Sequence, residues 1–254
     1  MRGLAAQLPY NRHVLILALD TSSASGSLAV LRDKQTIGSI STWTEETYSS
    51  RMFRQLDFLL RELSLSLDAF DLFAVTAGPG SFTGLRVGLA AVKGWAEVYR
   101  KPIAAVSALE AVAAQSNSIT CLVIPVLDAR RGQVYFGIYT RRQTSDGSGL
   151  ALEGEERVAT PDEFVAALKE QSPKADFAVI TPTPSLISGA LSRFETGRTT
   201  GAPIRIEEAS SILAPEVGRL GYFRAQRGEL ADSLSLDANY VRRSDAELHW
   251  KEPK

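Results

Sequence analysis

Cysteine and histidine are scarce in this sequence: its 254 residues include one Cys and two His. The single thiol, Cys121, excludes an internal disulfide and suits a reducing compartment. A metal-dependent transferase or protease needs imidazoles at helical spacing with a carboxylate beside them, whereas His13 and His249 stand near opposite ends of the chain. The sequence therefore predicts no catalytic residue and no metal site of its own.

Long hydrophobic runs and an excess of charge of one sign are also absent. Residues 1–12 carry no extended apolar stretch, so we expect no signal peptide, no membrane anchor and a cytoplasmic protein. The 28 Lys and Arg balance 29 Asp and Glu, which argues against a protein whose whole surface binds nucleic acid. Arginine doublets at 130–131, 141–142 and 242–243 are typical of solvated loop ends, so any contact with RNA would be local.

Two stretches of the chain follow the same plan. The run HVLILALD ends in Asp20, a polar turn follows, and SLAVL resumes a strand. The run CLVIPVLD ends in Asp128 and leads through ARRG into a returning strand, QVYFGIY. Helical segments separate and follow these hairpins. We therefore predict a duplicated α/β protein with an N-terminal lobe over 14–107 and a C-terminal lobe over 108–254.

The glycine-rich stretch TAGPGSFTGLRVG, residues 76–88, follows a buried strand and opens a helix. Gly84 is followed by Leu and Arg, so the Lys and hydroxyl of a Walker loop are absent, and it stands one residue late for a dinucleotide fingerprint. Ser81 or Thr83 is available to cap the free amides of the helix. The stretch therefore predicts a capped helix start in preference to an anion site.

The helix itself has an apolar arc that covers more than half of its circumference. Gly84, Gly88, Ala91 and Trp95 fall on one side, and glycines at a spacing of four permit the close approach of another helix. We predict that one flank packs on the sheet and the other on a partner; the preceding helix of the same chain is the alternative. On the first interpretation Gly88→Leu leaves the fold intact and weakens pairing.

Four segments, ILALDTSS, AGPGSFTGLRVG, LDARRGQVYFGIY and YVRR, together resemble the family of bacterial tRNA threonylcarbamoyladenosine biosynthesis proteins called TsaB or YeaZ-like. The resemblance runs from about Val14 to Arg242, with residues 141–210 matched only by the order of elements. It implies the actin-like/hsp70-like ATPase (ribonuclease H-like) fold with two duplicated lobes. One departure is Tyr48, where relatives often carry a His.

The resemblance also implies a function. The chain would be a non-catalytic partner of its paralogue TsaD, which transfers a threonylcarbamoyl group from threonylcarbamoyl-AMP to N6 of the adenosine beside the anticodon, in tRNAs that read codons starting with A. TsaE is a further partner, tRNA is reached through the complex, and ATP and a metal belong to that complex. A homodimer through the same face is expected when the chain is alone. The implied interface residues are Met52, Leu56, Leu59, Gly84, Gly88, Ala91 and Trp95.

An independent nucleotide-dependent enzyme of kinase-like type is the alternative. Asp20 and Asp128 end equivalent strands, where actin-like ATPases place carboxylates near magnesium, so Asp20 is a candidate nucleotide and magnesium residue. The competing interpretation is that each Asp opens a tight turn by accepting hydrogen bonds from local amides. Magnesium-dependent ATP turnover that Asp20→Ala abolishes would favour the enzyme.

Overall fold

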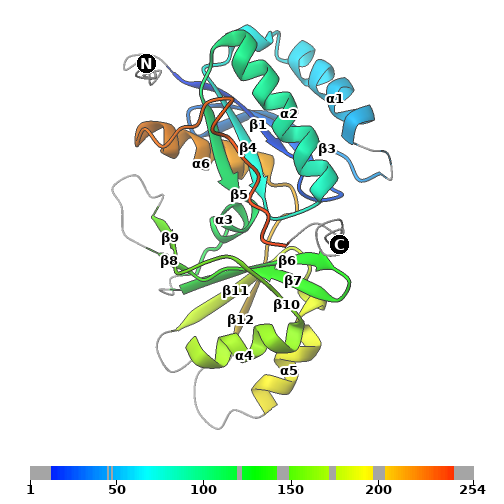
Figure 1. Cartoon of the computed structure of the whole chain (residues 1–254), viewed down its shortest axis with the longest axis vertical. Helices are drawn as coiled ribbons and strands as arrows, with labels where there is room; N and C mark the ends of the chain where they lie inside the picture. The colour runs from blue at the N-terminus through cyan, green and yellow to red at the C-terminus, as the bar shows by residue number, and fades with distance from the viewer. Residues whose placement is uncertain are drawn as a thin grey trace, which may run out of the picture.

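The computed structural model describes residues 13–44, 46, 48–118, 122–141, 149–171, 176–196 and 204–242. It has two α/β lobes, each built on a mixed sheet, and Figure 1 shows one lobe above the other. The predicted α/β class is confirmed. No helix in the described part of the chain is both long and apolar enough to span a bilayer.

The first sheet has five strands in the order β3-β2-β1-β4-β5. β1 pairs with β2 antiparallel and with β4 parallel, and β5 extends the sheet parallel to β4. The strands are β1 (Leu15–Asp20), β2 (Ser27–Arg32), β3 (Gln35–Ser41), β4 (Leu72–Gly78) and β5 (Ile103–Ser107). The predicted first hairpin is therefore confirmed and forms the centre of this sheet.

The second sheet repeats this order as β10-β7-β6-β11-β12, and the short strands β8 and β9 extend from β6. Again the central strand pairs antiparallel with the next strand and parallel with a later one, so the predicted duplication is confirmed. The returning strand QVYFGIY is not continuous, because β7 ends before Gly137 and β8 begins after Ile138. The strands are β6 (Leu122–Arg130), β7 (Gln133–Phe136), β8 (Tyr139–Arg141), β9 (Leu150–Leu152), β10 (Arg157–Ala159), β11 (Phe177–Thr181) and β12 (Arg205–Glu208).

Helices cover both faces of the first sheet. Side chains alternate along β1, so Leu17 and Leu19 join the core under α1 and α2, while Ile16 and Ala18 join the core under α6. In Figure 1 α1 and α2 lie side by side, and α4 and α5 lie on the far side of the second sheet. The helices are α1 (Tyr48–Glu62), α2 (Phe82–Tyr99), α3 (Ala108–Ala113), α4 (Pro161–Gln171), α5 (Ser188–Thr196) and α6 (Ala214–Gln226), with 3-10 turns at Leu67–Ala69 and Pro184–Leu186.

The last helix, α6, packs on the first sheet although it follows the second. A β-carbon on Gly218 would lie 2.2 Å from Cδ1 of Leu31, and one on Gly221 would lie 2.8 Å from Cβ of Ala74. These glycines let the helix backbone approach the sheet closely. The chain then continues along the first lobe, as the red segment in Figure 1 shows, and the backbone of Ala231 bonds that of Ile103. The predicted assignment of 108–254 to the second lobe is therefore wrong for 214–242, because order along the chain is not order in space.

Candidate functional site

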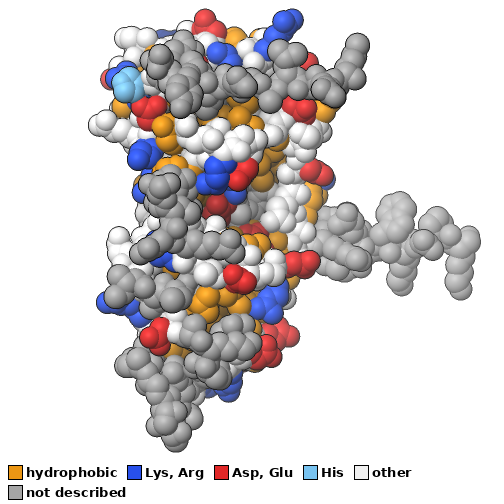
Figure 2. All heavy atoms as spheres, turned by 90° about the vertical axis from the view of Figure 1, so that its left-hand side faces the viewer, with side chains coloured by type: hydrophobic (Ala, Val, Ile, Leu, Met, Phe, Trp, Pro, Cys, Tyr) orange, Lys and Arg blue, Asp and Glu red, His pale blue; other side chains and the backbone are white. Residues whose placement is uncertain are grey.

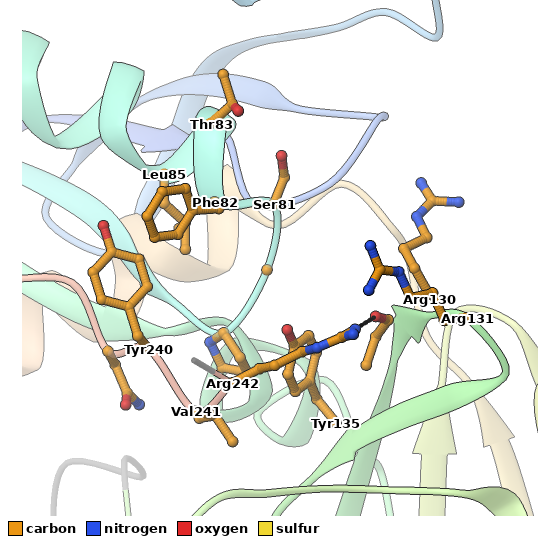
Figure 3. Close-up of a pocket in the computed structure, with 14 residues that line it drawn as sticks. Ser81, Phe82, Thr83, Leu85, Arg130, Arg131, Tyr135, Tyr240, Val241 and Arg242 are labelled. Atoms are coloured by element: carbon orange, nitrogen blue, oxygen red, sulfur yellow. Dashed lines mark hydrogen bonds between the residues drawn. The ribbon is translucent and has the colours of Figure 1, made fainter. Parts of the chain in front are cut away.

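A cleft between the two lobes encloses about 490 Å³. One wall is the loop from β4 into α2, the second is the turn between β6 and β7, and the third is the C-terminal segment at residues 239–242. Figure 3 shows these walls converging. The lining residues are Pro79, Gly80, Ser81, Phe82, Thr83, Leu85, Ala129, Arg130, Arg131, Tyr135, Asn239, Tyr240, Val241 and Arg242.

The glycine-rich stretch forms the first wall of the cleft and packs closely against the turn that follows β1. A β-carbon on Gly84 would lie 2.1 Å from the carbonyl oxygen of Thr21, and one on Gly88 would lie 2.4 Å from Oγ1 of the same residue. The N–H of Ser81 also donates to the carbonyl of Ser22 at 2.7 Å. The expectation that Gly84 and Gly88 admit a partner's helix is therefore wrong, because these positions are filled by the chain's own turn. The predicted cap is confirmed, since the N–H of Gly84 donates to Oγ of Ser81 at 3.2 Å.

The third wall is fixed to the same loop. Gly78 has φ +126°, and a β-carbon there would lie 2.4 Å from the carbonyl oxygen of Asn239. The N–H of Asn239 donates to the carbonyl of Ala77 at 2.7 Å. The left-handed backbone at Gly78 and the close contact both require glycine. The C-terminal segment is thereby held against the start of α2.

Glu156 connects this segment to the second lobe. Its Oε2 accepts from Nδ2 of Asn239 at 2.7 Å, and its Oε1 accepts from Oη of Tyr139 at 2.6 Å and from Oγ of Ser107. Burial raises the pKa of the Glu156 carboxyl above its ordinary value, because desolvation disfavours the charged form. The role of Glu156 could not be predicted from the sequence, because its hydrogen-bond partners lie 17 to 83 residues away along the chain.

Asp20 lies outside the cleft and is fully buried. Its Oδ1 accepts from the N–H of Ser22 at 2.9 Å and from Oγ of Ser22 at 2.6 Å. Desolvation raises its pKa and outweighs these bonds. Asp20 does not line the cleft, and its candidate role toward a nucleotide and magnesium stays a prediction.

Hydrogen bonding to a local amide is confirmed for both aspartates, although only Asp20 ends its strand, because β6 continues past Asp128 to Arg130. In the second lobe the N–H of Arg130 donates to Oδ1 of Asp128 at 2.7 Å, as that of Ser22 does to Asp20 in the first. Among the described residues, no three His, Cys, Asp or Glu side chains are grouped so as to hold a metal ion. That the chain needs no metal or other cofactor of its own stays a prediction.

The predicted interface residues of α1 point into the core of the first lobe. Met52, Leu56 and Leu59 are buried against the sheet, so they are not available to contact a partner. The helical stripe correctly marks the apolar side of α1, and that side is the inner one. On α2, Ala91 and Trp95 are half-buried.

The outer flank of α2 carries an apolar stripe that shares only Ala91 with the interface residues expected from the sequence. Trp95 packs edge-on against Phe53 of α1, with 6.4 Å between ring centroids, so α1 covers part of this flank. The rest stays open: Phe53 is 52% and Val98 72% exposed, and a β-carbon on Gly94 would meet nothing within 4 Å. We call Val87, Ala91, Gly94 and Val98 the outer stripe.

Tyr48 anchors the start of α1 to the turn between β1 and β2. Its hydroxyl accepts from the N–H of Gly26 at 2.6 Å and donates to the carbonyl of Ser23. The guanidinium of Arg51 lies 4.4 Å from the centre of its ring and donates to the carbonyl of Ala24 at 2.9 Å. Tyr48 therefore has an internal role in the first lobe.

The chain is similar to known proteins over nearly its whole length. A family model described as "TsaD: tRNA N6-adenosine threonylcarbamoyltransferase" matches residues 32–188. The "tRNA threonylcarbamoyladenosine biosynthesis protein TsaB" of Bacillus subtilis (strain 168) is 30% identical over 239 residues, which are 93% of this chain and 98% of that protein. The chain belongs to the TsaB family.

Other TsaB relatives agree with this assignment. The TsaB protein of Haemophilus influenzae is 28% identical over 247 residues, 94% of this chain and 97% of its own length. A crystal structure from Pseudomonas aeruginosa, of a protein "with similarity to peptidase YEAZ", is 26% identical with a TM-score of 0.73 and covers 90% of this chain and all of its own. The expected actin-like fold with two duplicated lobes is confirmed.

Proposed function

We propose that this chain acts in the biosynthesis of threonylcarbamoyladenosine in tRNA, as the non-catalytic partner of a TsaD-type threonylcarbamoyltransferase. The names of its TsaB relatives support the pathway. In this proposal the transferase takes threonylcarbamoyl-AMP, TsaE assists it, and ATP and a metal belong to the complex. The chain contributes a docking surface.

The observation that carries the proposal is the outer stripe of α2 with Phe53 beside it. Val87, Ala91, Gly94 and Val98 recur at positions that bring one side chain per turn to the same edge of the helix. Small residues along such an edge permit close packing of a second helix pair. Phe53 and Val98 leave exposed apolar side chains at this edge, and apolar side chains gathered on an exposed face are typical of an interface.

The partner's chemistry follows from the family match. The TsaD model matches residues 32–188, which include both α1 and α2. A TsaD-type chain is therefore expected to carry an equivalent helix pair, and two such pairs would pack against each other with their outer stripes in contact. A second copy of this chain offers the same surface, so a homodimer is expected to compete when the transferase is absent.

Gly94→Arg tests the surface without disturbing the core. The position faces open space, so the new side chain fits the folded chain while placing bulk and charge on the outer stripe. Gly189→Arg is the matched control, because Gly189 lies in α5 and is equally open. The readouts are association with a TsaD-type protein by light scattering and tRNA threonylcarbamoylation in a mixture of threonylcarbamoyl-AMP synthase, TsaD and TsaE.

The control should behave as the wild type, whereas Gly94→Arg should weaken association and product formation at least about tenfold, since a buried unpaired charge costs several kcal/mol. Unchanged association of Gly94→Arg would reject the outer stripe as the interface. Product that forms equally well without this chain would reject the proposed function itself.

A further inference from the structure

Leu234 is 91% exposed, on a turn in the segment that follows α6. Figure 2 shows one face of the chain, where hydrophobic side chains lie in small groups between charged and polar ones. A single exposed leucine is common on such a surface and by itself indicates nothing. Leu234 differs from a scattered exposed residue because its turn is firmly held and because the turn borders the outer stripe.

The turn from Asp232 to Leu236 is ordered by its own hydrogen bonds. Oδ1 of Asp232 accepts from the N–H of Leu234 at 3.0 Å and from that of Ser235 at 2.7 Å. The N–H of Leu236 donates to the carbonyl of Asp232 at 3.2 Å, and the N–H of Asp232 donates to Oγ of Ser235 at 3.1 Å. The aspartate thus fixes the backbone around Leu234, which leaves little conformational entropy to be lost when the side chain is bound.

Both ends of this turn are attached to the first lobe. The backbones of Ala231 and Ile103 exchange two hydrogen bonds, at 2.8 and 3.0 Å. Leu236 is buried in the same core cluster as Leu89 and Val92 of α2. The turn therefore cannot move away from the first lobe without breaking buried contacts.

The turn borders the outer stripe at the C-terminal end of α2. Oγ of Ser233 donates to Oε2 of Glu97 at 2.6 Å. Glu97 directly precedes Val98, the last residue of the outer stripe. In Figure 1 α2 runs between α1 and the red segment that follows α6. The outer stripe is therefore flanked by Phe53 of α1 on one side and by the turn that carries Leu234 on the other.

The outer stripe is too small to hold a partner by itself. A stable protein interface buries about 800 Å² on each partner and involves roughly 20–30 residues a side. Two residues of the stripe, Ala91 and Gly94, offer little apolar area. A stable pairing therefore needs further contacts beside the stripe, and Leu234 supplies one on a turn that continues the same surface.

We propose that Leu234 extends the docking surface and packs against apolar side chains at the edge of the equivalent helix pair of a TsaD-type chain. This inference rests on the proposed function, because the surface that the turn continues is the outer stripe. The turn lies outside residues 32–188, which the TsaD model matches, so it is not part of the helix pair that the two chains are expected to share. Leu234 thus adds a contact that this chain supplies from outside the shared helices.

Leu234→Ala tests this contact without disturbing the fold, because so exposed a side chain makes few contacts within the folded chain. Ile206→Ala is the matched control, since Ile206 is exposed on β12 of the second lobe. The full-length variants are titrated with a TsaD-type protein by calorimetry, and Gly94→Arg is the reference for the outer stripe. The midpoint of urea denaturation should be unchanged in both alanine variants.

Leu234→Ala should weaken association about tenfold, because it removes most of a buried leucine side chain, while Ile206→Ala stays within about twofold of the wild type. A second measurement reports the contact directly. A photoreactive benzoylphenylalanine in place of Leu234 should crosslink to the TsaD-type chain, and the same group in place of Ile206 should not.

The outcomes separate this inference from the proposed function. Wild-type association of Leu234→Ala, or the lack of a crosslink from position 234, would overturn the inference. If Gly94→Arg still weakens association in that case, the proposed function stands. A wild-type chain that does not associate with the TsaD-type protein would overturn the proposed function and this inference with it.

Discussion

Oγ1 of Thr21 lies 2.4 Å from the point that a β-carbon on Gly88 would occupy. Thr21 is itself buried, and its carbonyl oxygen lies 2.1 Å from the point that a β-carbon on Gly84 would occupy. Helix α2 therefore rests on the turn after β1 at a distance that no side chain permits. This contact explains why two glycines are kept inside a helix, although each costs roughly 1 kcal/mol of helix propensity relative to Ala.

Gly88→Leu should destabilise the fold by about 1–3 kcal/mol or more, because the new side chain overpacks a buried turn. The measurement is the free energy of unfolding from urea denaturation. The earlier expectation from sequence, that this variant keeps the fold and loses only pairing, is thereby reversed.

Gly94→Ala is the control on the same helix. A β-carbon at Gly94 meets nothing within 4 Å, so the change should be neutral or stabilise by up to about 1 kcal/mol through helix propensity. Equal stabilities of the variants at positions 88 and 94 would contradict the packing role of Thr21.

Much of the fold could be predicted from sequence because it depends on local periodicity. The runs ending in Asp20 and Asp128 are continuous and apolar, and each is followed by a turn and a returning strand. Each run forms the central strand of its own sheet, and the two sheets have the same pairing order. The start of α2 at Ser81 was predictable in the same way, since a cap is a local interaction.

The contacts of each surface could not be predicted, because they join segments far apart in the chain. Spacing showed that Gly84 and Gly88 share a side of α2 but not that Thr21 occupies it. The arginines were visible as doublets, and only the path of the chain after α6 brings Arg242 to Arg130. Amphipathic periodicity likewise marks an apolar face without showing whether it meets the core or a partner.

Tyr48→Phe should cost about 1–3 kcal/mol, because it removes the hydroxyl that joins the N–H of Gly26 to the carbonyl of Ser23. The ring still packs under Arg51, so the loss reports the hydroxyl alone. Urea denaturation measures it, with Tyr99→Phe near the end of α2 as the control. A loss no larger than that of the control would show that the turn does not depend on Tyr48.

Asp20→Asn should change how stability depends on pH. Burial raises the pKa of Asp20 above its ordinary value of 3.8, so the folded chain retains a proton that the unfolded chain releases. The stability contributed by this group is present below about pH 4 and is lost as the pH rises through the raised pKa. Asparagine does not ionise, so the variant escapes this loss.

The stability of Asp20→Asn relative to wild type should therefore rise as the pH increases above about 4 and through the raised pKa. Urea denaturation across that range measures the difference. Asp57→Asn, at an exposed ion pair of α1, serves as the control. A difference for Asp20→Asn that stays constant with pH would mean that the buried carboxyl is ionised throughout.

Glu156→Ala should loosen the tie between the C-terminal segment and both lobes. Oγ of Ser107, Oη of Tyr139 and Nδ2 of Asn239 all lose their acceptor at once. Tyr139 is buried, and a buried donor without an acceptor costs about 1–3 kcal/mol, so the loss should exceed that of an exposed hydrogen bond. Glu153→Ala is matched to it, because Glu153 is exposed in the same loop and accepts from Thr140.

The same variant separates a stabilising role from a positioning role. Because Asn239 precedes the cleft residues Tyr240 and Arg242, its release should raise hydrogen exchange at residues 239–242 more than in the core strands. Stability and exchange equal to those of Glu153→Ala would show that Asn239 is held by its backbone bond to Ala77 alone. Faster exchange confined to this segment would show that Glu156 positions the third wall of the cleft.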